Sequence, residues 1–280
     1  MIKSRKIELL APAKNLECGI EAINHGADAI YIGAPRFSAR AAAGNTLEDI
    51  KALAEYAHQF RAKVYVALNT ILTDKELLEV EFLIWQLYNE AKVDALIIQD
   101  MGITMLNLPP IPLHASTQMD NRSVEKVKFL ENAGFKQIVL PRELTVDEIS
   151  EIAAQVNTPL EVFVHGALCV SYSGQCYLSE ALSGRSANKG ACAQYCRLPY
   201  TIVEANGEEI VSKKHMLSMK DLNLADNLEE LLKARVRYIK IEGRLKDVSY
   251  EKNVIACYRQ KLDKVLDKNP QYVRSSSGYY

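Results

Sequence analysis

The chain has 280 residues, of which 48% are apolar and 25% are charged, the composition of an ordinary globular protein. Its 34 Lys and Arg residues nearly balance its 35 Asp and Glu residues, for a formal net charge of -1. This balance argues against a domain that binds nucleic acid through bulk positive charge alone, but it leaves room for a local basic patch. The apolar runs are too short to span a bilayer or to form a signal-peptide core, so we expect a cytoplasmic protein that does not enter a membrane.

Short apolar runs alternate with helical patterns along most of the chain. The runs that predict buried strands are Ile7–Ala13, Ala29–Gly33, Lys63–Asn69, Ala95–Gln99, Leu113–Thr117, Gln137–Leu140, Leu160–His165 and Tyr238–Ile241. The patterns that predict helices are Leu16–His25, Leu47–Arg61, Lys75–Ala91, Val124–Ala133, Val146–Val156, Asn227–Ala234 and Tyr250–Leu266. Two of the helices begin with a hydroxyl residue followed three positions later by an acid, Thr46 with Asp49 and Thr73 with Glu76.

This alternation predicts a parallel sheet with right-handed crossovers. Eight strand–helix units in about 250 residues favour a closed (β/α)8 barrel, which we place over residues 1–268. An open doubly wound sheet is the alternative fold. Against it, the first strand is followed by Ala11-Pro12-Ala13-Lys14-Asn15, which is no Gly-rich dinucleotide fingerprint.

The repeat is interrupted after the seventh strand by residues 167–237, which contain most of the cysteines. Within this insertion, Asn206-Gly207 lies between the apolar runs Tyr200–Glu204 and Glu209–Val211, which predicts a β-hairpin. We expect the insertion at the carboxyl-terminal face of the barrel, where barrel enzymes have their active sites. Residues 269–280 show no periodicity and are predicted to be a linker or the truncated start of a further region.

Four of the six cysteines fall within 28 residues, as Cys169, Cys176, Cys192 and Cys196. Clustered cysteines in a cytosolic chain are typical of metal ligands, and four thiolates suit either an iron–sulfur cluster or structural zinc. Tightly spaced zinc pairs and the three-cysteine pattern of radical enzymes are both missing, and unligated thiols remain a third alternative. Cys18 and Cys257 lie in helical patterns and are predicted to be packed thiols. A dyad of His165 with Cys169 is disfavoured, because His165 ends a buried strand.

Several motifs resemble the signature of the collagenase-like peptidases (peptidase family U, number 32). They are Leu10-Ala11-Pro12-Ala13, Gly26–Gly33, Glu161–Cys169, Gly174–Ser179, Asn188-x-Gly190, Cys192-x3-Cys196-Arg197 and Lys240–Arg244. The resemblance covers nearly the whole chain. It implies oxygen-independent hydroxylation of a transfer-RNA wobble uridine, of a 23S ribosomal-RNA cytidine or of a quinone ring, and we expect the transfer-RNA uridine slightly ahead of the ribosomal cytidine. It also implies a cysteine-bound 4Fe-4S cluster and, in the RNA-modifying branches, prephenate as the source of the hydroxyl oxygen.

The resemblance also points to one branch of the family. In some quinone-modifying members a later cysteine is the fourth ligand, but here Met219-Lys220-Asp221-Leu222 is followed by Asn223. The implied ligands are therefore the four clustered cysteines, as in the RNA-modifying branches. Zinc, or an empty site after handling in air, is the alternative to the cluster. A peptidase and a non-catalytic subunit with a structural metal are the alternative functions. RNA, prephenate and a paired homologous subunit are the expected partners.

A carboxylate such as prephenate needs guanidinium partners, since their planar fork donates two hydrogen bonds to it. The candidate substrate-binding residues follow predicted strands and are Arg36, Arg40, Arg142, Arg244, Gln118 and Asn69. Glu242 and Glu143 are the candidate catalytic residues, as acid–base groups or as partners that orient the arginines. The alternative is that such Arg–Glu pairs at a barrel rim are only salt bridges.

Overall fold

The computed structural model describes residues 4–38, 45–243 and 246–277, and its centre is a closed barrel of parallel strands. The hydrogen-bonded order is β1-β2-β3-β4-β5-β6-β7-β11, and β11 pairs with β1 to complete the ring. The strands are β1 (Arg5–Ala13), β2 (Ala29–Gly33), β3 (Lys63–Leu68), β4 (Ala95–Ile98), β5 (Leu113–Ala115), β6 (Gln137–Val139), β7 (Leu160–Gly166) and β11 (Tyr238–Ile241). The closed ring confirms the predicted barrel and excludes the open sheet.

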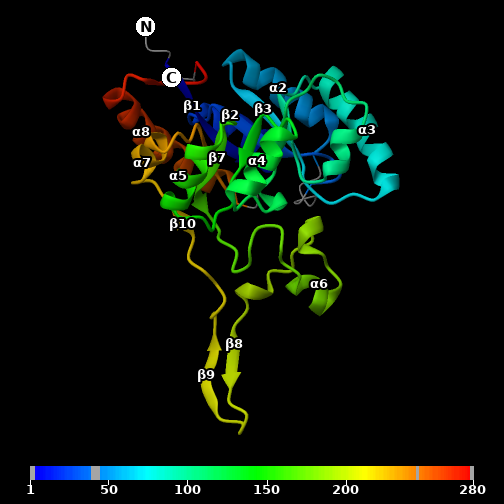
Figure 1. Ribbon diagram of the computed structural model, residues 1–280, viewed down its shortest axis with the longest axis vertical. Helices are drawn as coiled ribbons and strands as arrows, with labels where there is room; N and C mark the ends of the chain where they lie inside the picture. Colours follow the sequence, from blue (N-terminus) through cyan, green and yellow to red (C-terminus); the bar gives the residue numbers. More distant parts are fainter. Residues whose placement is uncertain (1–3, 39–44, 244–245, 278–280) are drawn as a thin grey trace.

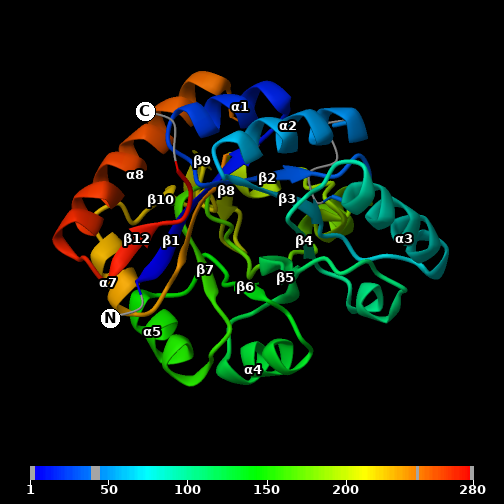
Figure 2. The same cartoon turned by 90° about the horizontal axis from the view of Figure 1, so that it is seen from above.

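Helices surround the barrel on its outside, as Figure 2 shows. They are α1 (Leu16–Asn24), α2 (Leu47–Gln59), α3 (Asp74–Asn89), α4 (Val124–Asn132), α5 (Val146–Gln155), α7 (Leu228–Lys233) and α8 (Val248–Lys268). The predicted capping boxes at Thr46 and Thr73 begin α2 and α3. Between β4 and β5 the chain forms the short 3-10 helix η2 (Met101–Met105), which ends before Pro109 and Pro110.

The insertion after β7 extends away from the barrel along the long axis of the molecule (Figure 1). It contains α6 (Leu178–Ser183), the 3-10 turns η4 (Ala187–Lys189) and η5 (Tyr195–Arg197), and an antiparallel hairpin of β8 (Tyr200–Val203) with β9 (Glu209–Lys214). The chain then returns as β10 (Leu222–Asn223), which pairs antiparallel with the end of β7. Because Leu222 lies opposite Gly166, the insertion leaves and rejoins the barrel at one place.

A short strand closes the carboxyl-terminal part of the described chain. We expected a linker or the start of a further region over 269–280, and within it Tyr272–Arg274 form β12, which pairs in parallel with the start of β1. The buried carboxylate of Asp28 accepts hydrogen bonds from Arg259 on α8, at 3.0 Å, and from Arg274. Three residues are too few to produce a periodic pattern, which is why the strand was not predicted.

Apolar side chains fill the space between strands and helices, and a second cluster lies inside the barrel. The inner cluster consists of Leu10, Ala29, Tyr31, Tyr65, Ala67, Ala95 and Ile97. Cys18 is buried as predicted. The prediction for Cys257 was wrong, because α8 turns Ile255 and Tyr258 inward and leaves Cys257 exposed. No helix in the described part of the chain is long and apolar enough to cross a membrane.

Candidate functional site

A small pocket of about 50 Å³, open to solvent on one side, lies at the carboxyl ends of the barrel strands. Its rim is made of residues that lie within three positions after the end of a strand, namely Asn69, Ser116, Thr117, Gln118, Arg142 and Glu242. Side chains of the strands themselves form its wall, namely Tyr31, Ala67, Ile97, Val139, Phe163 and Lys240. The structure therefore gathers four of the predicted site residues, Arg142, Gln118, Asn69 and Glu242, around one pocket at the face where barrel enzymes have their active sites.

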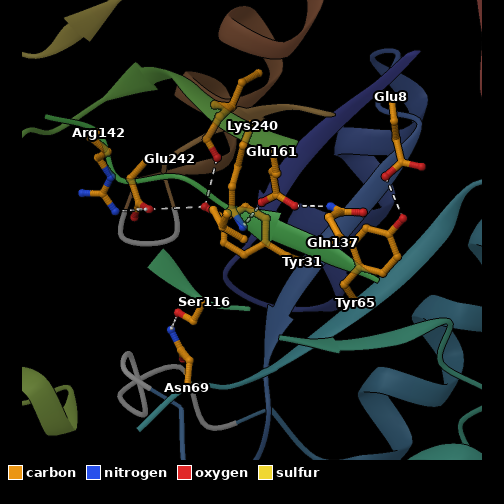
Figure 3. Close-up of polar contacts among 12 residues, drawn as sticks. Glu8, Tyr31, Tyr65, Asn69, Ser116, Gln137, Arg142, Glu161, Lys240 and Glu242 are labelled. Carbon is orange, nitrogen blue, oxygen red and sulfur yellow. Dashed lines mark hydrogen bonds and ion pairs between the residues drawn. The ribbon is translucent and has the colours of Figure 1, made fainter. Parts of the chain in front are cut away.

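Arg142 and Glu242 form the polar centre of this pocket (Figure 3). The Arg142 Nη2 donates to Glu242 Oε2 at 3.1 Å, and its Nη1 donates to the Ala167 carbonyl oxygen at 3.0 Å. The guanidinium lies 4.3 Å from the centroid of the Phe163 ring. The Tyr31 hydroxyl donates to the Ile241 carbonyl oxygen at 2.9 Å and lies 3.4 Å from Glu242 Oε2. The Arg142 side chain is thus fixed from three sides, with its fork beside the pocket.

A second ion pair lies deeper inside the barrel. Lys240 Nζ and Gln137 Nε2 donate to the two carboxylate oxygens of Glu161 (Figure 3). The Lys240 ammonium also lies 4.2 Å from the centroid of the Tyr31 ring and 5.2 Å from that of Phe163. Because Glu161 and Lys240 are almost fully buried, each side chain compensates the charge of the other, and Lys240 lines the pocket.

Buried titratable groups also lie toward the amino-terminal ends of the strands, outside the pocket. Glu8 accepts hydrogen bonds from the Tyr65 hydroxyl at 2.7 Å and from Lys63 at 3.0 Å, and burial raises its pKa to about 7. Burial lowers the pKa of His114 to about 3, and its ring packs edge-on against Tyr65. His114 is therefore neutral at physiological pH and has a structural role.

The first part of the insertion, the cysteine loop (residues 167–177), is fixed to the barrel beside the pocket. Glu143 accepts hydrogen bonds from the Ser173 backbone N–H at 2.8 Å and from its hydroxyl at 3.1 Å. The next residue, Gly174, has a φ of +77°, and a Cβ there would lie 2.1 Å from the Gln118 carbonyl oxygen. Only glycine permits this close approach, which places the loop directly against the rim of the pocket. Arg197 adds a hydrogen bond to the Leu168 carbonyl oxygen.

The four clustered cysteines all lie in the insertion, but the structure does not bring their thiols together. Cys169 and Cys192 are exposed, while Cys176 and Cys196 are half-buried. Among residues 4–38, 45–243 and 246–277, no three His, Cys, Asp or Glu side chains are grouped so that they hold a metal ion. The donor type fits an iron–sulfur cluster or zinc, whereas the arrangement of the thiols in this structure fits neither.

Other predicted site residues lie away from the pocket. Arg36 is 64% exposed and pairs with Glu79 on α3. Glu143 does not line the pocket, and its contacts with Ser173 make it a positioning residue for the cysteine loop. Arg40 and Arg244 lie outside the described residues. Both ring nitrogens of His165 face tyrosine hydroxyls, at 2.8 Å from Tyr250 and 3.4 Å from Tyr258, an arrangement that does not support a thiol–histidine dyad.

Three residues that line the pocket were not predicted from sequence, namely Tyr31, Phe163 and Lys240, and neither was Glu161, the partner of Lys240. A signal was present for two of them. Glu161 and Lys240 are charged residues inside otherwise apolar strands, and a charge at such a position is rarely buried without a partner. Ser116 and Thr117 were expected, together with Gln118, to point toward the site from the end of the predicted strand at 113–117, and all three line the pocket.

Comparison with proteins of described function finds relatives over almost the whole chain. The chain is 54% identical over 277 residues to a 23S rRNA 5-hydroxycytidine C2501 synthase from Escherichia coli, an alignment that covers 99% of this chain and 42% of that protein. It is 34% identical over 270 residues to tRNA hydroxylation protein P1 from Bacillus subtilis, with coverage of 93% and 64%. A protein from Porphyromonas gingivalis named Collagenase is 32% identical over 272 residues, with coverage of 91% and 65%. The chain thus spans less than two thirds of each of these relatives.

Solved structures support the fold alone. The U32 peptidase Mk0906 superposes with a TM-score of 0.57 at 13% sequence identity, covering 85% of this chain and 94% of that one. A phosphoribosyl anthranilate isomerase from Thermus thermophilus gives a TM-score of 0.51 at 11% identity, covering 92% of this chain and all of the other, 100%. At family level the match is direct, because the model of peptidase family U32 aligns with residues 14–278. The chain therefore belongs to peptidase family U32.

Proposed function

We propose that this chain is the catalytic barrel of an RNA-modifying enzyme that hydroxylates a pyrimidine base without molecular oxygen. The base that we favour is a cytidine of 23S ribosomal RNA, because the ribosomal-RNA synthase is 54% identical and the transfer-RNA protein 34%. This choice revises the order of the two RNA substrates expected from sequence, where the transfer-RNA uridine came slightly first. The observation that carries the proposal is the fixed guanidinium of Arg142 at the mouth of the pocket, in a chain this similar to an RNA hydroxylase.

The pocket suits a small carboxylic acid such as prephenate as the source of the hydroxyl oxygen. Arg142 is held by Glu242, by the Ala167 carbonyl oxygen and by Phe163, so it meets a carboxylate without first being ordered. Its Nε and the Thr117 hydroxyl are buried without a hydrogen-bond partner among the described residues. Unpaired donors beside a pocket are favourable partners for the oxygens of a bound acid. Glu242 orients Arg142 and is the candidate acid–base group.

The four clustered cysteines are the proposed ligands of a 4Fe-4S cluster, which supplies electron transfer when it is bound. The support is their donor chemistry and the place of Cys169 and Cys176 on the cysteine loop, which Gly174 presses against the rim of the pocket. Binding requires the exposed and half-buried thiols to move together. The chain's own contribution is the anchoring of that loop through Glu143 and Ser173, which keeps it beside Arg142.

The test is a nucleoside analysis of purified 23S rRNA and tRNA from cells that lack this gene. We expect 5-hydroxycytidine to disappear from the 23S rRNA and to return with the wild-type gene but not with Arg142→Gln. The control is Arg36→Gln, which alters an exposed arginine paired outside the pocket and should restore the base fully. A loss confined to 5-hydroxyuridine in tRNA would move the substrate to tRNA. Unchanged nucleosides together with cleavage of unfolded collagen by the purified protein would overturn the proposal in favour of a peptidase.

A further inference from the structure

An exposed aromatic ring, Tyr172, lies on the cysteine loop beside the two contacts that fix this loop to the barrel. The residue is 57% exposed. The next residue, Ser173, is held by Glu143 through its backbone N–H and its hydroxyl, and Gly174 packs against the Gln118 carbonyl oxygen. The Tyr172 carbonyl oxygen also accepts a hydrogen bond from Gln175 N–H at 3.1 Å. The ring is thus solvent-exposed although its backbone is firmly placed.

A guanidinium covers one face of this ring. The central carbon of Arg122 lies 3.6 Å from the ring centroid of Tyr172. Arg122 is itself held by Asp120, to which its Nε and Nη2 donate, the latter at 2.9 Å. Asp120 has a φ of +59°, a left-handed conformation that non-glycine residues adopt rarely. With one face on a fixed cation, the exposed area of the ring lies on its other side.

We infer that Tyr172, backed by Arg122, is a stacking platform for a base of the RNA substrate; this inference rests on the proposed function. Single-stranded RNA is bound by exposed aromatic rings on which bases stack, and an ordered ring loses little entropy on binding. The platform adjoins Gln118, which lines the pocket, through the contact with Gly174. A base stacked on Tyr172 therefore flanks the nucleotide that enters the pocket. Stacking needs no net positive charge, which agrees with the charge of -1 of the whole chain.

The chain offers a matched control on the outer wall of the barrel. Phe129 on α4 is also an exposed ring, at 54%, with the Lys126 ammonium 5.5 Å from its centroid. Phe129 differs from Tyr172 in its position relative to the pocket, because α4 packs on the outside of the barrel (Figure 2). Substitution of either ring by leucine removes a similar exposed surface, so only the position of the ring relative to the pocket separates the two variants.

The experiment measures the affinity of the wild-type chain, Tyr172→Leu, Tyr172→Phe and Phe129→Leu for a fluorescein-labelled decaribonucleotide of alternating uridine and cytidine. We expect Tyr172→Leu to bind about 5- to 100-fold more weakly, the loss typical of one base–aromatic stack. Tyr172→Phe and Phe129→Leu should bind as the wild type does. Equal melting temperatures of the four proteins show that the loss is not caused by unfolding.

The salt dependence separates stacking from a phosphate contact. If Tyr172 stacks on a base, the slope of log affinity against log salt is the same for Tyr172→Leu and the wild type. A slope that is lower by about 0.7 in the variant would show that Arg122 had lost a phosphate, and would overturn the inference. Equal affinity of the wild type and Tyr172→Leu would also overturn it and leave the proposed hydroxylation intact, since nucleoside analysis tests that separately. Absence of wild-type binding to the labelled strand would overturn it as well.

Discussion

Arg142 and Glu242 are 100 positions apart in the chain, and their side chains form an ion pair of 3.1 Å that is 13% exposed at the arginine and 6% at the glutamate. Each follows the end of a barrel strand, Arg142 after β6 and Glu242 after β11, and β7 lies between these strands in the ring. The curvature of the barrel brings the two ends together over Phe163 of β7. The pair therefore links the proposed substrate-binding group, Arg142, to the stability of the barrel mouth.

Loss of the arginine should therefore affect both properties. Arg142→Gln leaves the Glu242 carboxylate buried without its cation, and we expect it to lower the free energy of unfolding by about 3 kcal/mol. Arg142→Lys keeps the charge but not the planar fork, so it should recover most of the stability and none of the base hydroxylation. Urea unfolding and nucleoside analysis measure the two effects. Arg36→Gln, at an exposed pair, should change stability by less than about 1 kcal/mol; a similar loss in both variants would contradict a special role of the buried pair.

Gly174 should tolerate no side chain. In Gly174→Ala the new Cβ would lie 2.1 Å from a backbone oxygen, so the cysteine loop must move away from the pocket rim. We expect loss of hydroxylation and rapid proteolysis of the insertion. Gly184→Ala shares the positive φ, at +67°, and nothing lies within 4 Å of its Cβ, so it isolates backbone strain from the clash. If the two variants behaved alike, strain alone would explain the effect.

The cysteine assignment predicts the metal content of single variants. After anaerobic reconstitution, we expect about four irons and four sulfides per wild-type chain. Serine at any one of Cys169, Cys176, Cys192 and Cys196 should lower the iron content, since each thiolate is a proposed ligand. Cys257→Ser alters an exposed cysteine on α8 and should keep the full content. If the wild-type chain instead held about one zinc ion and no sulfide, the cysteines would have a structural role and not a redox role.

The buried carboxyl of Glu251 on α8 predicts a dependence of stability on pH. Burial raises its pKa from 4.5 to about 7, so the folded state retains a proton that the unfolded state releases at lower pH. Stability should therefore fall as the pH rises from about 4.5 to about 7 and remain lower above that range. Glu251→Gln should reduce the stability difference between pH 5 and pH 8 by about 1–3 kcal/mol, measured by urea unfolding at each pH.

A residual dependence on pH is expected in that variant, because burial raises the pKa of Glu8 to about 7 as well. Glu229 is the control, since it lies on the exposed side of α7 paired with Lys233 and its pKa is lowered. Glu229→Gln should therefore keep the wild-type difference between pH 5 and pH 8. An identical difference in Glu251→Gln and the wild type would show that the Glu251 carboxyl is ionised in the folded protein throughout this range.

The barrel was predictable because each of its strands carries a local apolar pattern and each following helix carries a periodic one. Strand β12 was not, since three residues that pair at the edge of β1 leave no periodic trace. Nor was β10, whose two residues are strand only because the end of β7 is beside them. These elements depend on tertiary contacts, and a local pattern contains no record of those contacts.

Site residues were predictable from sequence only where their place after the end of a strand was enough to bring them to the pocket. Arg142, Glu242 and Asn69 follow strands and reach the pocket for that reason. Arg36 follows a strand too, but its long side chain turns outward to Glu79 on α3, a contact that strand order does not determine. The partnership of Lys240 with Glu161 also depends on the pairing of β11 with β7, two strands that the whole insertion separates in the sequence.

Because Leu222 pairs with Gly166, the insertion is a loop whose two ends lie side by side at the end of β7. A loop whose ends are held together can lengthen at little entropic cost, since the entropy of loop closure grows only with the logarithm of the loop length. The neighbouring barrel strands therefore do not have to move when the insertion becomes longer or shorter or is replaced by another sequence. The far end of the insertion, which carries the β8–β9 hairpin, can therefore vary while the strand ends that line the pocket keep their places (Figure 1).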